Sequence, residues 1–195
     1  MNYKALSTAE KLAAIADCNF WGEEIALAGE YALAVADGNR SVIEDYESFG
    51  DSPRQFIMNK REYARAVSVF GFTEKRFNAH GWIDGFTFAD CETVVFEVKA
   101  HVIGRNSITT GRSPNGKWTH GLDLAASKAG SGSGLSVFGD PYNSRRECLI
   151  TVLKRLIAWH EKENDQRTAP VLKEAKNMLD ELTGRKPVQL SLFTL

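Results

Sequence analysis

Thr93-Val94-Val95-Phe96-Glu97-Val98-Lys99-Ala100-His101-Val102-Ile103 is the stretch that decides the fold class. Apolar and polar residues nearly alternate along it, which is typical of a half-buried β-strand. The preceding stretch Trp82-Ile83-Asp84-Gly85-Phe86-Thr87-Phe88 has a similar pattern. We therefore predict two strands that pair as a hairpin, with Ala89-Asp90-Cys91-Glu92 as the connection between them.

A second antiparallel pair is expected next along the chain. Ser107–Arg112 and Lys117–Ala125 flank Ser113-Pro114-Asn115-Gly116, and Asn-Gly is the preferred pair for a tight hairpin turn. The Gly/Ser-rich stretch Lys128–Leu135 is typical of a loop, and Leu135–Phe138 is a candidate last short strand. The pattern predicts an antiparallel sheet of about four to five strands.

Helical patterns lie on the N-terminal side of these strands. Ser7-Thr8-Ala9-Glu10 is a capping box that opens one helix, and Trp21–Val35 has apolar residues at helical spacing until Asp37-Gly38-Asn39 ends it. A polar stretch, Asp45–Pro53, precedes a short predicted helix over Arg61–Phe70.

Two further helices are expected after the strands. Ser144 and Glu147 form a second cap ahead of an apolar stripe that runs through Trp159. Thr168 and Pro170 then begin a helix that Gly184 ends. The sequence therefore predicts an α+β protein: an antiparallel sheet packed by N-terminal and C-terminal helices, with a mobile C-terminal peptide. The expected divisions are a helical region at 1–76, a sheet domain at 77–184 and a docking peptide at 185–195.

Composition limits the classes of function. The chain has 195 residues, of which 43% are hydrophobic, and a formal net charge of −1, so any contact with nucleic acid must be local. The odd number of widely spaced cysteines, Cys18, Cys91 and Cys148, predicts buried thiols in a reducing compartment, with neither a disulfide nor a zinc site. There is no apolar run of membrane-spanning length and no signal-peptide pattern, so we expect a cytoplasmic protein.

The last residues form an apolar peptide beyond Gly184 and Pro187. Its core is Gln189-Leu190-Ser191-Leu192-Phe193. Three apolar side chains on an extended peptide can fill a groove, while the Gln189 amide donates and accepts hydrogen bonds. Burying Leu192 and Phe193 on a partner would contribute roughly 3 to 6 kcal/mol before ordering costs, which suits micromolar docking. The alternative is a tail that packs on the protein's own core.

This peptide resembles the bacterial sliding-clamp-binding motif, by which polymerases and repair factors dock on the processivity ring. The resemblance implies a partner, the DNA polymerase III β subunit, with Gln189, Leu192 and Phe193 as anchors assisted by Leu190. The stretch Val94–Trp159 also resembles a small module of phage, plasmid and integrated-element proteins. Together these resemblances imply a mobile-element accessory protein that acts in or against DNA replication and repair.

A second resemblance implies chemistry. Asp84 followed by Glu97-Val98-Lys99 resembles the PD-(D/E)xK nuclease pattern, which implies a Mg²⁺-dependent DNA nuclease. If the first hairpin is symmetric about Asp90 and Cys91, Asp84 lies opposite Glu97 and the two carboxylates can share a cation. Lys99 then points to the same face. The nuclease pattern, however, expects a helix soon after the lysine. The alternative is that Glu97 and Lys99 lie on the solvent face of an amphipathic strand. If the nuclease interpretation fails, no cofactor is expected.

The remaining candidates are weaker. Basic residues around the hairpins, with a tryptophan for stacking, form a candidate nucleic-acid patch: Arg105, Arg112, Lys117 and Trp118. The four histidines, His80, His101, His120 and His160, lack a neighbouring nucleophile or ligand at motif spacing and are read as structural or solvated. Gly130–Gly134 lacks the lysine of a P-loop, so it is read as a strand connection. A self-associating domain without docking or catalysis is the third possibility.

Overall fold

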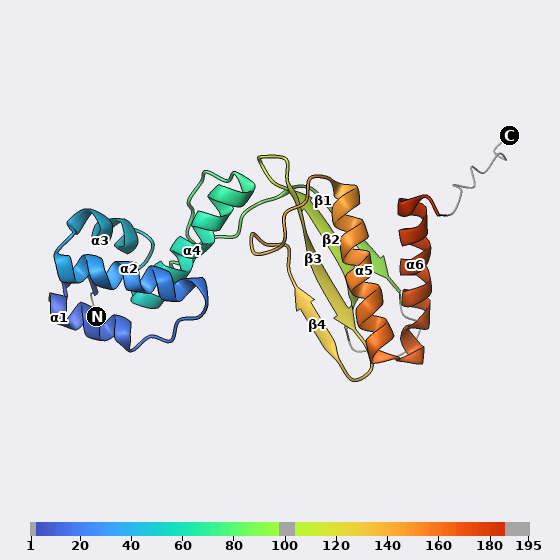
Figure 1. Ribbon diagram of the computed structural model, residues 1–195, viewed down its shortest axis with the longest axis horizontal. Helices are drawn as coiled ribbons and strands as arrows, with labels where there is room; N and C mark the ends of the chain where they lie inside the picture. Colours follow the sequence, from blue (N-terminus) through green and yellow to red (C-terminus); the bar gives the residue numbers. More distant parts are fainter. Residues whose placement is uncertain (1–2, 98–103, 186–195) are drawn as a thin grey trace. The chain divides into compact units, whose positions relative to one another are not determined.

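The computed structural model describes residues 3–97 and 104–185 and confirms the α+β class. The chain divides into two compact units, Met1–Phe86 and Thr87–Leu195. Figure 1 shows helices in the first unit, and a sheet with two helices in the second. The first unit contains η1 (Tyr3–Ala5), α1 (Thr8–Ala16), α2 (Glu23–Asp37), α3 (Arg40–Glu47) and α4 (Pro53–Phe70). The second contains β1 (Ala89–Phe96), β2 (Asn106–Arg112), β3 (Trp118–Ala125), β4 (Gly130–Ser133), α5 (Arg145–Glu163), η2 (Gln166–Thr168) and α6 (Ala169–Thr183).

An aromatic cluster forms the centre of the first unit. Tyr31 of α2, Tyr46 of α3 and Phe56 of α4 are fully buried, and the ring centroids of Tyr31 and Phe56 lie 4.7 Å apart. The Tyr31 hydroxyl donates to Glu47 at 2.9 Å, and Lys11 of α1 pairs with the same carboxylate at 2.6 Å. The buried Glu47 carboxylate is thus matched by a cation and a donor, as burial of a charge requires.

The helix signals in this unit are largely confirmed. Ser7 and Glu10 form the predicted capping box, and α2 ends at Gly38 in the left-handed conformation. The predicted start at Arg61 is wrong, because α4 begins at Pro53, where Ser52 caps the helix. Pro is favoured at a first helical turn since its missing N–H has no partner there. Helix α3, capped by the Asn39 side chain, was not predicted.

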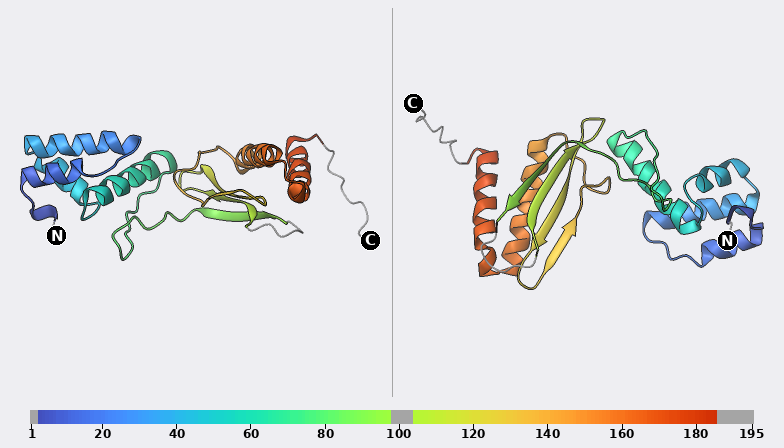
Figure 2. Two further views of the ribbon diagram at one scale, coloured as in Figure 1. Left: turned by 90° about the horizontal axis from the view of Figure 1, so that it is seen from below. Right: turned by 180° about the vertical axis from the view of Figure 1, so that it is seen from behind.

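The sheet of the second unit is an antiparallel meander with strand order β1-β2-β3-β4. The predicted β2–β3 hairpin is confirmed: the Gly116 N–H donates to the Ser113 carbonyl at 2.9 Å, and Arg112 pairs with Trp118. Figure 2 shows α5 and α6 on one face of this sheet. The core lies between these two helices and the sheet. Phe96 and Ile108 from the strands pack against α5 residues that include Leu153.

The first predicted hairpin is wrong. Ala89–Glu92 is not a turn but part of β1, which pairs with β2 and carries an irregularity between Ala89 and Glu92. The stretch Trp82–Phe88 does not form the partner strand. Residues 82–86 belong to the first unit, and Thr87 and Phe88 begin the second. Ile83 is buried, and its N–H donates to the Asn59 side chain of α4 at 3.0 Å.

The last strand also differs from the prediction. Strand β4 is Gly130–Ser133, inside the predicted loop, whereas Leu135–Phe138 is not a strand. After β4 the chain passes close to β3: a Cβ on Gly121 would lie 2.7 Å from the Leu135 backbone nitrogen. The chain then returns to pair with β3, where Tyr142 bridges Trp118. A glycine at position 121 is therefore required for this close approach.

Candidate functional site

The tail leaves the fold from an anchored helix end. Helix α6 packs against the sheet core through Val171 and Ala175, and it ends at Gly184 in the left-handed conformation. The Arg146 guanidinium of α5 donates to the Leu182 carbonyl at 3.0 and 2.7 Å, which fixes the last turn of α6. The predicted docking residues lie outside the described part of the chain: Gln189, Leu190, Leu192 and Phe193.

The structure does not bring the three nuclease-type residues together in the predicted way. Asp84 belongs to the first unit, where its N–H donates to the Arg76 carbonyl at 2.9 Å, and Glu97 follows β1 in the second unit. Both carboxylates are exposed, and Lys99 lies outside the described residues. Because the hairpin that was to align Asp84 with Glu97 does not form, the geometric reason for a shared cation no longer applies. Among the described residues, no group of three His, Cys, Asp or Glu side chains could hold a metal ion.

The predicted basic patch is divided between the two ends of β2. Arg105 precedes this strand, whereas Arg112 ends it and pairs with Asp90 at 2.6 Å. Lys117 donates to Asn143 at 2.5 Å, and Trp118 packs against the helix-covered core. At about 3.3 Å per residue, a strand of this length separates its ends by roughly 20 Å. Trp118 therefore contributes to packing, and the four residues do not share one surface.

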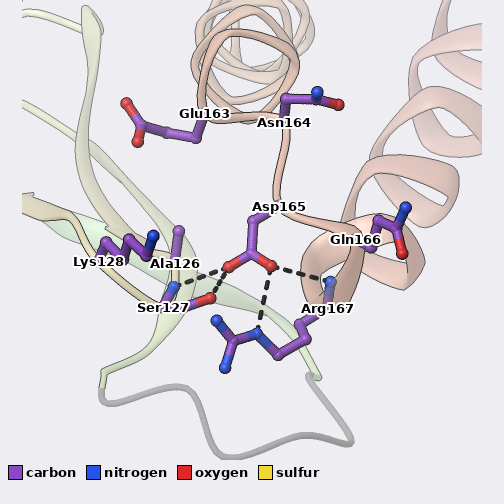
Figure 3. A pocket seen from close by; sticks show the side chains of 8 residues that line it. All are labelled: Ala126, Ser127, Lys128, Glu163, Asn164, Asp165, Gln166 and Arg167. Carbon is purple, nitrogen blue, oxygen red and sulfur yellow. Dashed lines mark hydrogen bonds and ion pairs between the residues drawn. The ribbon is translucent and has the colours of Figure 1, made fainter.

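A polar cavity of about 430 Å³ lies between the β3–β4 connection and the turn after α5. Figure 3 shows the Asp165 carboxylate at its centre, between Ser127 and Arg167. It accepts from the N–H of Ser127 at 2.8 Å and from that of Arg167 at 3.1 Å, and also from the Ser127 hydroxyl. These hydrogen bonds, that from the Ser127 N–H foremost, hold the Asp165 pKa below its usual range. The cavity is thus centred on a carboxylate that ties two connections together.

A second cavity, of about 220 Å³, lies beside β3. His120 and Arg155 contribute to its wall, and the segment that follows β4 contributes the rest: Ser133, Gly134, Ser136, Phe138, Gly139 and Asp140. His120 is only 7% exposed, and burial, assisted by the Arg155 charge, lowers its pKa. The imidazole is therefore neutral at pH 7, with one nitrogen that donates and one that accepts.

Sequence reasoning missed this cavity. By sequence, His120 is one of four scattered histidines and Gly130–Gly134 has the composition of a strand connection. The Gly/Ser-rich run was the available signal, but Arg155 lies far along the chain and is brought close only by the packing of α5 on the sheet. A lone histidine in a strand carries no sequence mark that distinguishes a cavity wall from a core position.

An apolar groove of about 380 Å³ lies between α2 and α4 in the first unit. Its wall includes Leu27 and Ala64, with Glu23 and Arg61 among its charged residues. Exposed apolar side chains, Ile25 and Leu33, lie along the same helix α2. Exposed apolar groups grouped on one helix are typical of contact surfaces, although single ones are ordinary.

No helix in residues 3–97 and 104–185 is both long and apolar enough to cross a bilayer. Compared with known proteins, the chain matches no protein-family model, and no curated protein and no solved structure is significantly similar to it.

Proposed function

We propose that this protein is a phage or mobile-element accessory factor that docks on the bacterial sliding clamp through Gln189-Leu190-Ser191-Leu192-Phe193. The pentapeptide itself is the observation that carries the proposal. It combines an amide that can hydrogen bond in two directions with large apolar side chains at the spacing that a groove-binding peptide uses. A role in replication or repair, or against the host's replication, follows from the choice of partner.

The fold supports this proposal by the way α6 ends. The helix is held at its last turn by Arg146, and Gly184 reverses the backbone conformation directly after it. The pentapeptide begins five residues beyond Gly184, so it is presented from a fixed point of the folded unit. Anchoring the chain just before a binding peptide lowers the ordering cost that docking must overcome.

The test is a calorimetric titration of purified bacterial sliding clamp against the intact protein. We expect a dissociation constant in the micromolar range and loss of binding in the Gln189→Ala/Phe193→Ala double variant, since burying Phe193 alone contributes about 1.5 to 3 kcal/mol, a factor of roughly 10 to 150. The matched control is Val188→Ala/Thr194→Ala, which changes two residues outside the pentapeptide and should bind like the intact protein.

Equal binding by the two double variants would contradict the proposal, because the anchors would then contribute nothing. Absence of binding by the intact protein would reject the clamp as its partner. Circular dichroism of each variant checks that the helix and strand content of the protein is unchanged, so that a loss of binding reports on the peptide.

A further inference from the structure

The pairing of β3 is interrupted beside His120. Leu122 is the first residue of β3 that pairs with β4, and Trp118 pairs with Tyr142, with N–H to carbonyl distances of 2.8 and 2.9 Å. In an antiparallel ladder, every second residue directs its N–H and C=O to the same neighbour. The backbone N–H of His120 therefore points to this side of β3, into the interval between the two pairings, where the 220 Å³ cavity lies.

Three buried polar atoms, one on His120 and two on its neighbours, have no hydrogen-bond partner among the described residues. They are Thr110 Oγ1, His120 Nδ1 and Tyr142 Oη. Thr110 is directly opposite His120 in the ladder, and the His120 and Tyr142 ring centroids lie 5.9 Å apart. Buried polar groups are nearly always paired in native proteins. Of these three residues, His120 contributes to the wall of the cavity, so its unpaired Nδ1 indicates a water or ligand there. A water occupies about 30 Å³, and this cavity holds far more than one.

The groups at the cavity are mainly donors. Arg155 carries five guanidinium N–H groups, and Nη2 donates a hydrogen bond to Asp140 at 2.6 Å. That contact draws the guanidinium toward Asp140 and leaves other N–H groups of the fork for a second acceptor. The Ser136 hydroxyl accepts from the Phe138 N–H at 3.3 Å, so its proton remains to be donated, and Ser133 adds a second hydroxyl.

We propose that this cavity binds a phosphate group. Its donors are the Arg155 guanidinium, the Ser133 and Ser136 hydroxyls and the backbone N–H of His120. A phosphate offers several acceptor oxygens to donors that converge from different elements, and a guanidinium matches two of them at once. The Gly/Ser-rich segment lets the backbone approach such a ligand closely, which larger residues would prevent. Asp140 is a positioning residue that orients Arg155. The residues that line the cavity lie within 120–155 and none belongs to the C-terminal peptide, so the proposal can be tested independently of clamp docking.

The test is a titration of the full-length protein monitored by nuclear magnetic resonance. Three probes are titrated separately: inorganic phosphate, deoxyadenosine monophosphate and a short single-stranded DNA. We expect phosphate-bearing probes to shift the resonances of Ser136, Gly139 and His120. Arg155→Gln should weaken binding by about tenfold or more, the usual loss for a charge-assisted hydrogen bond. The matched control is Lys162→Gln, which removes one exposed positive charge from the same helix and should leave the affinity unchanged.

Ser136→Ala provides a second, milder variant, because it removes one donor while leaving the Arg155–Asp140 pair; it should weaken binding several-fold. Free phosphate binding as tightly as the DNA would identify a small anion as the ligand. Tighter binding of the DNA, still lost in Arg155→Gln, would identify a nucleic-acid backbone. The proposal is overturned if no probe binds, or if Arg155→Gln and Lys162→Gln bind equally well.

Discussion

The side chain of Asn106, the first residue of β2, hydrogen-bonds to β3 in the way that a strand backbone would. Its amide donates to the Ala125 carbonyl at 3.0 Å and accepts from the Ala125 N–H at 2.9 Å, as a paired backbone would. The same amide oxygen lies 2.9 Å from His160 Nε2 of α5. Because that oxygen is an acceptor, Nε2 must carry the proton and donate to it. Three elements therefore meet in one buried hydrogen-bond network.

Acid should weaken this network. Burial lowers the pKa of His160, with Asp165 and Glu163 opposing the shift, and burial also lowers that of His120. Near neutral pH the imidazoles are mainly neutral in both the folded and the unfolded chain, so their titration does not lower the free energy of unfolding there. Below a pH of about 6.5, the unfolded chain takes up protons that the folded chain refuses, so stability falls as pH falls, by at most about 1.4 kcal/mol per pH unit for each histidine.

Denaturant unfolding of the second unit at pH 7.5 and 5.5 checks this expectation. His160→Gln keeps a donor for Asn106, so it should lose about 1 kcal/mol at pH 7.5, while showing a smaller change between the two pH values. His80→Gln, in the first unit, is the matched control and should leave the difference as in the intact protein. An unchanged pH difference in His160→Gln would mean that His160 does not titrate on unfolding.

At the scale of elements, strong local signals predicted most of the structure. The Ser7 capping box, the Asn115-Gly116 turn and the apolar stripe of α5 each specify an element from neighbouring residues. Strand β4 escaped prediction because its Gly and Ser residues favour no strand; it forms because β3 offers a ladder partner. The alternation in Trp82–Phe88 is satisfied without strand pairing. The Ile83 N–H donates to Asn59 of α4, and Phe86 packs against Phe72, just beyond the end of α4, with ring centroids 4.9 Å apart. Such choices depend on tertiary neighbours, which local patterns do not report.

The link between the β3–β4 connection and the end of α5 depends on Asp165. One carboxylate oxygen accepts from Ser127 and the other from Arg167. Asp165→Asn keeps one acceptor and turns an amide N–H toward a donor, so we expect a lower melting temperature and faster amide hydrogen exchange at Ser127. Glu161→Gln, which removes the 2.7 Å exposed pair with Lys176, is the control and should change neither measurement. Slow exchange at Ser127 in Asp165→Asn would show that other contacts hold the connection.

At the scale of the whole molecule, the chain builds two separate cores. Tyr31, Tyr46 and Phe56 centre the first, and a cluster that includes Phe96 and Leu153 centres the second. A hydrophobic core of its own is what allows a domain to fold alone. The boundary at Phe86/Thr87 does not follow from a change in composition: Ile83 joins the first unit through its hydrogen bond to Asn59 of α4, and such a tertiary contact is not visible in the sequence.

This division predicts that residues 87–195 fold without the first unit and carry the whole of the clamp-docking function. The fragment contains the sheet, α5, α6 and the pentapeptide, so it should unfold cooperatively and bind the clamp within about twofold of the full chain. The fragment 1–86 should fold but not bind. Calorimetric titration of both fragments gives the comparison. A folded 87–195 fragment that binds about tenfold more weakly would assign part of the docking energy to the first unit, where the exposed side chains of α2 would be the residues to substitute next.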